Sequence, residues 1–314
     1  MVGLSEAFRL LNANGEKLNG SFIFSRDSYF LGALFLFLEI VLGTSIVAII
    51  KYFSSDVSLS IVLMFRYLFC LPILVVIGLK IGGTSYFKIK NKKVMSLRSV
   101  AGLLGLSFWY LSVIHLDISK ALALSQVMPI FICILSILFL GEKVGIYRWS
   151  AILVGLSGAV IIIDPDSKNW YNIGLLYIFL GTLFASIMFV SLRRLGMTEN
   201  AVATAFWYNL FGSFVFSIYC ISTFTFDNIS PGIWAMLIII GVMASAQQIF
   251  MALSHTYASA SSLAPVHYTT IPMGVVIGII VFNEKIDLSF MIGTFFIVGS
   301  TLFILYREKK KTSS

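Results

Sequence analysis

Long, nearly uninterrupted apolar runs separated by short polar links make up most of this chain. A helix needs about 20 mostly apolar residues to cross the hydrocarbon core of a membrane. The pattern predicts ten such helices, joined by links too short to hold a soluble domain. Their ranges are 29–50, 58–79, 94–115, 118–140, 145–163, 172–192, 201–223, 232–255, 260–282 and 288–306. The predicted fold class is therefore all-α and integral to a membrane.

The fourth and fifth apolar runs share a sequence pattern with the ninth and tenth runs, namely a run that contains proline followed by a Glu-Lys pair. The Glu-Lys pair within 140–143 follows the run that contains Pro129, and the pair within 282–285 follows the run that contains Pro272. The two Glu residues, Glu142 and Glu284, lie 142 positions apart. Such self-similarity predicts two copies of one unit. Because each copy has an odd number of helices, the copies enter the membrane in opposite directions and form an inverted-topology repeat.

The repeat also predicts the domain organisation, with two five-helix units between two tails. The predicted parts are a tail at 1–28, the first repeat at 29–163, the second repeat at 172–306 and a basic tail at 307–314. The first tail lacks the order of a signal peptide. It is predicted to be either a mobile cytosolic tail or a short interfacial helix.

Composition supports the membrane class. The 314 residues are 59% hydrophobic and 11% charged, whereas a soluble domain is about a quarter charged. The net charge of +8 would suit a nucleic acid, but the basic residues flank apolar runs and act as topology signals. Cys70, Cys133 and Cys220 lie inside apolar runs without metal-ligand spacing, which indicates packing roles. The sequence predicts no nucleic-acid partner, no metal and no cofactor.

The distribution of basic residues predicts the orientation. With the N-terminus inside, the 22 Lys and Arg residues lie on the cytoplasmic side, except Lys51, Lys120, Lys168, Lys285 and Arg66. Both termini are therefore predicted to be cytoplasmic. Without a presequence, the chain is expected in a bacterial inner membrane, with a eukaryotic organelle membrane as the alternative.

Arginine, glycine, aromatic and proline positions form a recognisable pattern in the first half of the chain. They are Phe65-Arg66-Tyr67, Arg98, Gly102, Gly105, Phe108-Trp109-Tyr110, Ala121, Ala123, Ser125, Pro129-Ile130-Phe131 and Leu140-Gly141-Glu142-Lys143. The second half continues the pattern less closely, through Ala264-Pro265, Pro272 and Asn283-Glu284-Lys285. This pattern resembles the EamA family of the drug/metabolite transporter superfamily. The resemblance implies ten helices in two inverted repeats around a central cavity, and transport of small metabolites or drugs. Lys120 and Glu39 depart from the family pattern, which affects the substrate class.

Glu39 is the strongest candidate for a functional side chain. It lies near the middle of the first run, where a carboxylate costs several kcal/mol unless it is paired, hydrated or protonated. Arg66, at a similar depth in the second run, is the expected partner. For Arg66 we predict a structural ion pair that joins the two helices, and for Glu39 a substrate or proton role.

Pro129 and Pro272 predict interruptions at matching positions of the two repeats. Proline removes one N–H and displaces the carbonyl four residues earlier, here those of Ser125 and Tyr268. Interrupted helices at matching positions point to a transporter site, although a plain kink is the simpler interpretation.

Polar and aromatic side chains near these prolines complete the predicted site. They suit an amphiphilic ligand that is partly planar or cationic, while helix packing is the alternative role for the aromatic residues. No group of His, Asp or Glu residues has metal-ligand spacing. The predicted substrate-binding residues are Glu39, Trp109, Ser125, Gln126, Gln247, His267 and Tyr268.

These features favour a secondary transporter that works by alternating access. No phosphate-binding loop for nucleotides is present, so direct use of ATP is not expected. The alternatives are an integral-membrane enzyme acting on a lipid-linked substrate and a non-transporting scaffold. Expected partners are membrane lipids and a small solute, such as an amino acid, a nucleoside-like or other cationic or zwitterionic metabolite, or a drug. Proton or ion coupling, transport direction and oligomeric state stay open.

Overall fold

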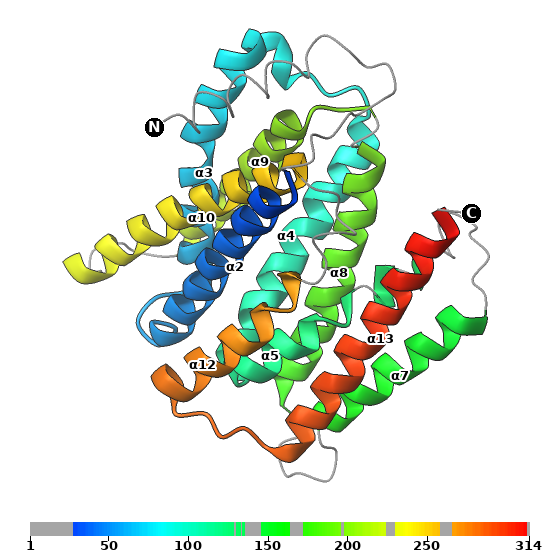
Figure 1. The fold of residues 1–314 in the computed structure, drawn as a ribbon. Coiled ribbons are helices and arrows are strands. Elements are labelled where there is room, and N and C mark those ends of the chain that lie inside the picture. Colours follow the sequence, from blue (N-terminus) through cyan, green and yellow to red (C-terminus); the bar gives the residue numbers. More distant parts are fainter. Residues whose placement is uncertain are drawn as a thin grey trace.

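The computed structural model describes residues 28–128, 130–132, 134–135, 146–163, 172–195, 198–223, 230–257 and 266–312. Within these residues the chain forms ten α-helices and one 3₁₀ turn, η1 (Gly83–Phe87), and no strands. The helices, shown in Figure 1, are α2 (Ser28–Tyr52), α3 (Leu59–Gly82), α4 (Lys92–His115), α5 (Ile118–Ser125), α7 (Ile146–Ile163), α8 (Ile173–Leu195), α9 (Ala201–Thr223), α10 (Pro231–Tyr257), α12 (Thr270–Phe282) and α13 (Leu288–Thr312).

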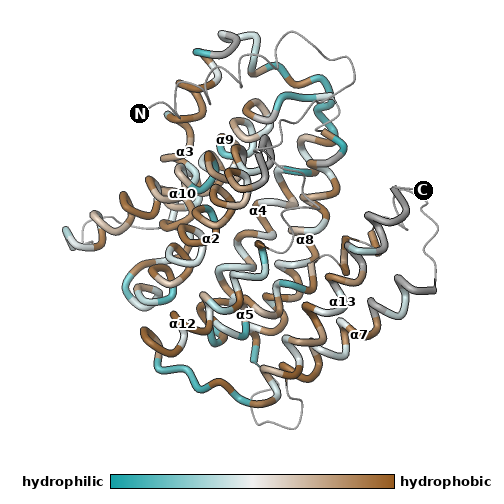
Figure 2. The backbone as a smooth tube through the Cα atoms, in the orientation of Figure 1, coloured by the Kyte–Doolittle hydropathy of each residue, from teal (hydrophilic) through white to brown (hydrophobic). Residues whose placement is uncertain are grey.

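The surface of the helices is that of a membrane protein, as predicted. Helices α2, α3, α4, α8, α9 and α10 each contain a stretch long and apolar enough to cross a membrane. Large apolar side chains cover the outside, with Ile221 75% exposed and Ile280 and Phe295 each 73% exposed. Hydrophilic residues gather before α4 and after α12, at opposite ends of the bundle (Figure 2). An apolar belt between polar ends is the surface that a bilayer requires.

Two of the predicted helices are interrupted, which corrects the ranges 118–140 and 260–282. α5 ends at Ser125 and is followed by a turn at Gln126–Val127, and α12 begins at Thr270 after a turn at residues 268–269. Both turns use the tighter i→i−3 pattern: the N–H of Gln126 donates to Ala123 O at 3.1 Å, and the N–H of Thr269 donates to Val266 O at 3.0 Å.

The interruptions lie at matching positions of the two repeats, because the first turn residues, Gln126 and Tyr268, have the same separation along the chain as Glu142 and Glu284. One detail of the prediction is wrong. The carbonyl of Tyr268 is not left free, since the N–H of Ile271 donates to it at 3.1 Å. Pro129 itself lies outside the described residues.

Helices from the two halves of the chain pack against each other. The main pairs are α4 with α8, α2 with α10, α3 with both α9 and α10, α5 with α12, and α7 with α13. Figure 1 shows the last pair running side by side along one flank of the bundle. When each helix is exchanged for its counterpart in the other repeat, α4–α8 becomes α10–α2, α3–α10 becomes the smaller α9–α4 contact, and the other three pairs are unchanged. The packing pattern is therefore symmetric with respect to the repeat.

Glycines bring α4 and α8 into backbone contact. A Cβ added at Gly105 would lie 2.9 Å from the backbone N of Ala185, and one added at Gly181 would lie 2.9 Å from the backbone N of Trp109. Side chains at these two positions would force the helices apart. Close approach through small residues is a common way for membrane helices to associate.

Candidate substrate site

Glu39, Gln247 and Arg66 form a connected polar group in the bundle. Gln247 Nε2 donates to Glu39 Oε1 at 2.8 Å, and Arg66 Nη2 donates to Gln247 Oε1 at 3.4 Å. The three side chains come from α2, α10 and α3. Only the amide nitrogen can donate to a carboxylate, and only the amide oxygen can accept from a guanidinium. The Gln247 amide therefore has the orientation that both partners require.

This arrangement differs from the direct ion pair that we expected between Glu39 and Arg66. Among the described residues, the ion pairs within 4.0 Å are Lys51–Glu284 and Lys120–Asp117. The amide of Gln247 lies between the two opposite charges instead. Gln247 belongs to the second repeat, so the link joins the two halves of the chain.

Arg66 is enclosed but incompletely hydrogen-bonded. Its side chain is buried at 6% exposure, and its Nε has no hydrogen-bond partner. The guanidinium lies over the ring of Tyr110, 5.8 Å from the ring centroid. A ring face attracts a cation but supplies no hydrogen-bond acceptor in the guanidinium plane. Arg66 thus retains donor capacity within the bundle.

Gly43 makes room for the Gln247 amide. It lies one turn after Glu39 on the same face of α2. A Cβ at Gly43 would lie 2.7 Å from Gln247 Nε2 and 4.0 Å from Glu39 Oε1. A larger residue at this position would collide with the amide where it meets the carboxylate.

The equivalent position in the other half of the bundle has no polar group. The α2–α10 contact corresponds to the α4–α8 contact, and the positions equivalent to Glu39, Gln247 and Gly43 are Gly181, Gly105 and Ala185. The two symmetry-related contacts therefore differ in polarity. The α4–α8 contact brings the two backbones together through glycines, whereas the α2–α10 contact contains a carboxylate and an amide.

A second polar network crosses the contact of α3, α4 and α9. The hydroxyl of Tyr208 donates to Gly102 O at 3.3 Å and lies 3.0 Å from the Tyr67 hydroxyl, which donates to it. Arg98 lies over the Tyr208 ring at 4.8 Å and donates through Nη1 to Thr204 O at 2.9 Å. The sequence pattern contained Tyr67 and Arg98, but it did not indicate Tyr208 as their shared partner.

Comparison with known proteins identifies the family. The model of the EamA-like transporter family matches residues 30–164 and again residues 172–306. The chain belongs to the EamA-like transporter family. It is therefore a multi-pass membrane transporter and not an enzyme, as the sequence predicted. The two matches coincide with the two predicted repeats to within one residue at each end.

Relatives of this EamA-like protein include transporters with different solutes. The chain is 25% identical over 283 residues to an S-adenosylmethionine uptake transporter of Rickettsia conorii, covering 90% of this chain and 95% of the relative. It is 28% identical over 241 residues to a riboflavin transporter of Brucella anthropi, covering 76% and 83%. A solved crystal structure aligns with a TM-score of 0.59 at 14% identity over 90% of this chain and 98% of the other. That likeness shows a shared fold.

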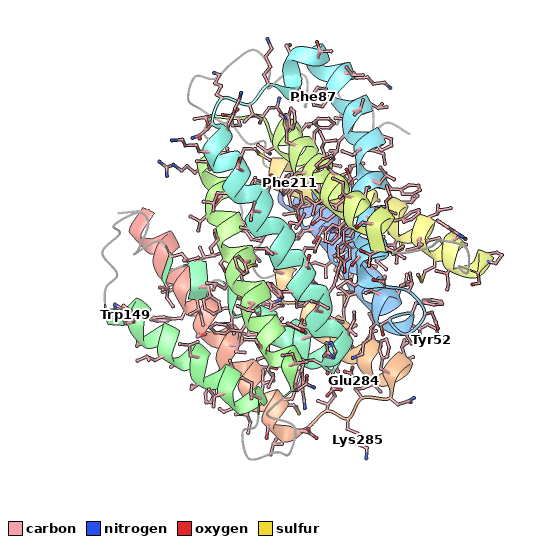
Figure 3. The ribbon with its side chains drawn as sticks, turned by 180° about the vertical axis from the view of Figure 1, so that it is seen from behind. Tyr52, Phe87, Trp149, Phe211, Glu284 and Lys285 are labelled. Carbon is pink, nitrogen blue, oxygen red and sulfur yellow. The ribbon has the colours of Figure 1, made fainter. Side chains whose placement is uncertain are left out.

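Glu284, the glutamate of the Asn-Glu-Lys motif in the second repeat, links three helices at one end of the bundle. Asn283 adopts a left-handed conformation with φ 53° and ends α12, and the N–H of Glu284 donates back to Gly278 O at 2.9 Å. This is a common way to end a helix, and Asn tolerates it better than most residues. Figure 3 shows Lys285 pointing away from the bundle, whereas the Glu284 side chain is only 4% exposed.

The carboxylate of Glu284 binds the start of α5 and the end of α2. It accepts from the N–H of Ser119 at 3.1 Å and from the Ser119 hydroxyl at 2.6 Å, and it pairs with Lys51 at 3.3 Å. The partners of Glu284 are thus a helix N-terminus and the distant Lys51, and not the neighbouring Lys285. Glu142 lies outside the described residues.

The other predicted site residues lie on α4, on and just after α5, and in the segment before α12. Trp109 packs against the main hydrophobic core, and its carbonyl accepts from Ser112 Oγ at 2.6 Å. Ser125 Oγ donates to Leu122 O at 2.7 Å within its own helix. Gln126 forms the end of α5 and is half-buried.

The start of α12 lies against α2 next to Glu39. Val266 and Met273 pack against Leu36 and Ile40, which flank Glu39 in sequence. His267 in this segment is exposed, and its carbonyl accepts from Thr270 Oγ1 at 2.6 Å. Tyr268 packs against the main core.

Of the predicted site residues, the structure joins Glu39, Gln247 and Arg66 directly through hydrogen bonds. Sequence patterns missed Gly43, because it carries no charge and does not break a helix.

Proposed function

We propose that this protein is a secondary transporter that moves a small organic metabolite across a bacterial inner membrane by alternating access. The observation that carries the proposal is the link from Glu39 through Gln247 to Arg66, in which an amide of the second half of the chain joins two opposite charges of the first half within the apolar part of a transporter fold. Charged groups in such a position are costly and mark solute or ion pathways. A scaffold would not need them.

The proposed architecture is two inverted-topology repeats at 29–163 and 172–306, with both termini cytoplasmic. Three observations support it: five helices fall within each family match, the packing pairs are symmetric under exchange of the repeats, and both repeats contain an interrupted helix at the same position. Two similar units of opposite orientation can exchange roles, which gives inward-open and outward-open states of similar energy.

Relative movement of the repeats would change the surroundings of Glu39. Its own helix belongs to the first repeat, whereas Gln247 belongs to the second. A solute shifts the balance between two states only if it binds one of them more strongly. Separation of α2 from α10 would remove the amide from Glu39 and leave the carboxylate free for a solute or a proton. Coupling to a proton or another ion is part of this hypothesis.

The proposed solute is cationic or zwitterionic, as expected for a buried carboxylate. S-adenosylmethionine, the solute of one relative, carries a sulfonium and an amino-acid group on a nucleoside and meets this description. Glu39 and Arg66 would contact its charged part, and Trp109, Ser125, Gln126, Gln247, His267 and Tyr268 are the proposed surrounding residues. Riboflavin, the solute of another relative, has no cationic group for Glu39.

Uptake by the purified protein in liposomes tests the proposal. We expect saturable entry of labelled S-adenosylmethionine that exceeds entry into protein-free liposomes and falls at least about tenfold in Glu39→Gln, which corresponds to loss of one charged contact. Asp287→Asn, at an exposed position, is the matched carboxylate control and should transport normally. If the folded protein moves neither this solute nor any member of an amino-acid, nucleoside and flavin panel, the transporter proposal fails.

A further inference from the structure

We infer that the site takes a zwitterionic amino-acid group, with the ligand carboxylate on Arg66 and the ligand ammonium on Glu39, in the place that the Gln247 amide occupies. This inference rests on the proposed transport function and specifies which chemical class of solute the site selects. It concerns the charged part of the ligand and leaves the remainder of the ligand undefined.

The Gln247 amide has the polarity of such a ligand. Its NH2 group, whose hydrogens carry partial positive charge, donates to Glu39 at 2.8 Å, and its oxygen, which carries partial negative charge, accepts from Arg66 at 3.4 Å. An α-amino acid presents an ammonium donor and a carboxylate acceptor on adjacent carbons, at a comparable separation. The amide is therefore a neutral group whose two ends match the two charges of the ligand.

Arg66 is better suited to a carboxylate than to this amide. The 3.4 Å contact is longer than the 2.7–2.9 Å that is typical of a guanidinium bonded to an anion, and the buried Nε has no partner. A carboxylate can accept from two nitrogens of one guanidinium at once. A ligand carboxylate would therefore use the donor that the protein leaves unsatisfied.

The fold does not need the polar group for packing. The symmetric contact between α4 and α8 forms through Gly105 and Gly181 at the positions equivalent to Gln247 and Glu39. Glycines at this crossing bring two helices into backbone contact without any charge. A carboxylate with an amide at the other crossing is thus best explained by a ligand that requires them.

The two charges together exclude ligands with a single charge. A cation without a carboxylate would pair with Glu39 but would leave Arg66 close to a second positive charge. An anion without an ammonium would meet the reverse problem beside Glu39. Like charges at short range in a medium of low polarity repel strongly. Selection therefore operates by repulsion as well as by attraction.

The decisive experiment compares ligands that differ only in the carboxylate. Calorimetric titration of the full-length protein in lipid nanodiscs uses two pairs of probes: S-adenosylmethionine with decarboxylated S-adenosylmethionine, and L-methionine with L-methionine methyl ester. We expect at least one zwitterion to bind, and its partner without the carboxylate to bind at least about tenfold more weakly, since one charge-assisted contact is lost. Equal binding within both pairs, or no binding of either zwitterion, overturns the inference.

Substitutions show which residue discriminates between ligands with and without the carboxylate. In Arg66→Gln the two members of a pair should bind with equal affinity, whereas Arg66→Lys, which keeps the charge, should retain part of the preference. Lys120→Gln removes a basic residue that pairs with Asp117 at the bundle end, so it should leave the preference unchanged. A preference that survives in folded Arg66→Gln contradicts the assignment. Uptake of riboflavin without binding of any zwitterion would refute this inference while leaving the transporter proposal intact.

Discussion

The hydroxyl of Ser119 donates to the carboxylate of Glu284 at 2.6 Å, although the two residues are 165 positions apart. The contact fixes the N-terminus of α5 to the C-terminal end of α12, and Lys51 joins it from the end of α2. A carboxylate at a helix N-terminus satisfies free N–H groups and interacts favourably with the helix dipole. One side chain thus connects the two repeats at one end of the bundle.

Removal of the Glu284 charge should destabilise the protein. Glu284→Gln leaves the mostly buried Lys51 without its counter-charge and weakens the bonds to Ser119, so we expect the free energy of unfolding to fall by about 1–3 kcal/mol. Thermal unfolding in detergent measures the change. Lys285→Gln, at the exposed neighbouring position, is the control and should unfold like the natural protein. An unchanged unfolding temperature for Glu284→Gln would show that the contact contributes no stability.

Substitution of Gly43 should impair the site more than the fold. The added Cβ of Gly43→Ala lies 2.7 Å from Gln247 Nε2, the end of a flexible side chain, which can move away from Glu39. We expect a near-normal folded yield, whereas transport or ligand affinity should fall by about tenfold, which corresponds to one hydrogen bond to a charged group. Uptake assays and size-exclusion chromatography provide the two measurements.

Two further glycines serve as controls for Gly43→Ala. A Cβ at Gly299 meets nothing within 4 Å, so Gly299→Ala should leave both folding and transport unchanged. A Cβ at Gly105 would strike the backbone of α8, which cannot move away alone, so Gly105→Ala should lower the folded yield. Equal losses of yield in Gly43→Ala and Gly105→Ala would contradict the difference between side-chain and backbone contacts.

Glu199 should make stability depend on acid pH. Desolvation opposes its ionisation, but N–H groups of Lys90 and Asn91 donate to the carboxylate at 2.8–3.2 Å, and together these bonds lower the pKa of Glu199 below its usual value of 4.5. A carboxyl whose pKa is lower in the folded state stabilises that state above the unfolded pKa and loses this effect as pH falls through the folded pKa.

The comparison of the natural protein with Glu199→Gln tests this pH dependence. The difference in unfolding temperature should be constant near neutral pH and should shrink as the pH is lowered below about 4.5. Because Glu199 lies near the surface, high salt should reduce the difference. A difference that stays constant down to about pH 3 would mean that the ionised form of Glu199 is not the stabilising one.

The proposed orientation predicts which ends of the bundle are accessible from outside. Lys90 precedes α4, Lys285 follows α12, and both are exposed. The hydrophilic segments before α4 and after α12 lie at opposite ends of the bundle (Figure 2). In intact cells, a membrane-impermeant thiol reagent should label Lys285→Cys and should leave Lys90→Cys unlabelled. The natural Cys70 and Cys220 are buried, which limits background labelling at these two residues. The opposite labelling pattern would show that the proposed orientation in the membrane is wrong.

The lengths of the apolar runs located most of the helices but not their interruptions. Run length predicts a membrane helix well, because a membrane-spanning segment must satisfy its backbone internally over a fixed thickness. The same criterion placed one continuous helix over 118–140, where α5 ends at Ser125. Hydropathy does not change at a turn that stays within the bundle, so only the prolines indicated the break.

The sequence by itself determined the membrane class, the two repeats and the family, since each depends on residue type and spacing along the chain, and it singled out Glu39 as a candidate. Only the tertiary structure decided that Gln247, 208 positions from Glu39, lies between Glu39 and Arg66. The reason is that the facing sides of α2, α3 and α10 are set by how closely distant helices approach one another. That approach depends on side-chain volumes at each crossing, such as the missing Cβ of Gly43, and no local pattern encodes it.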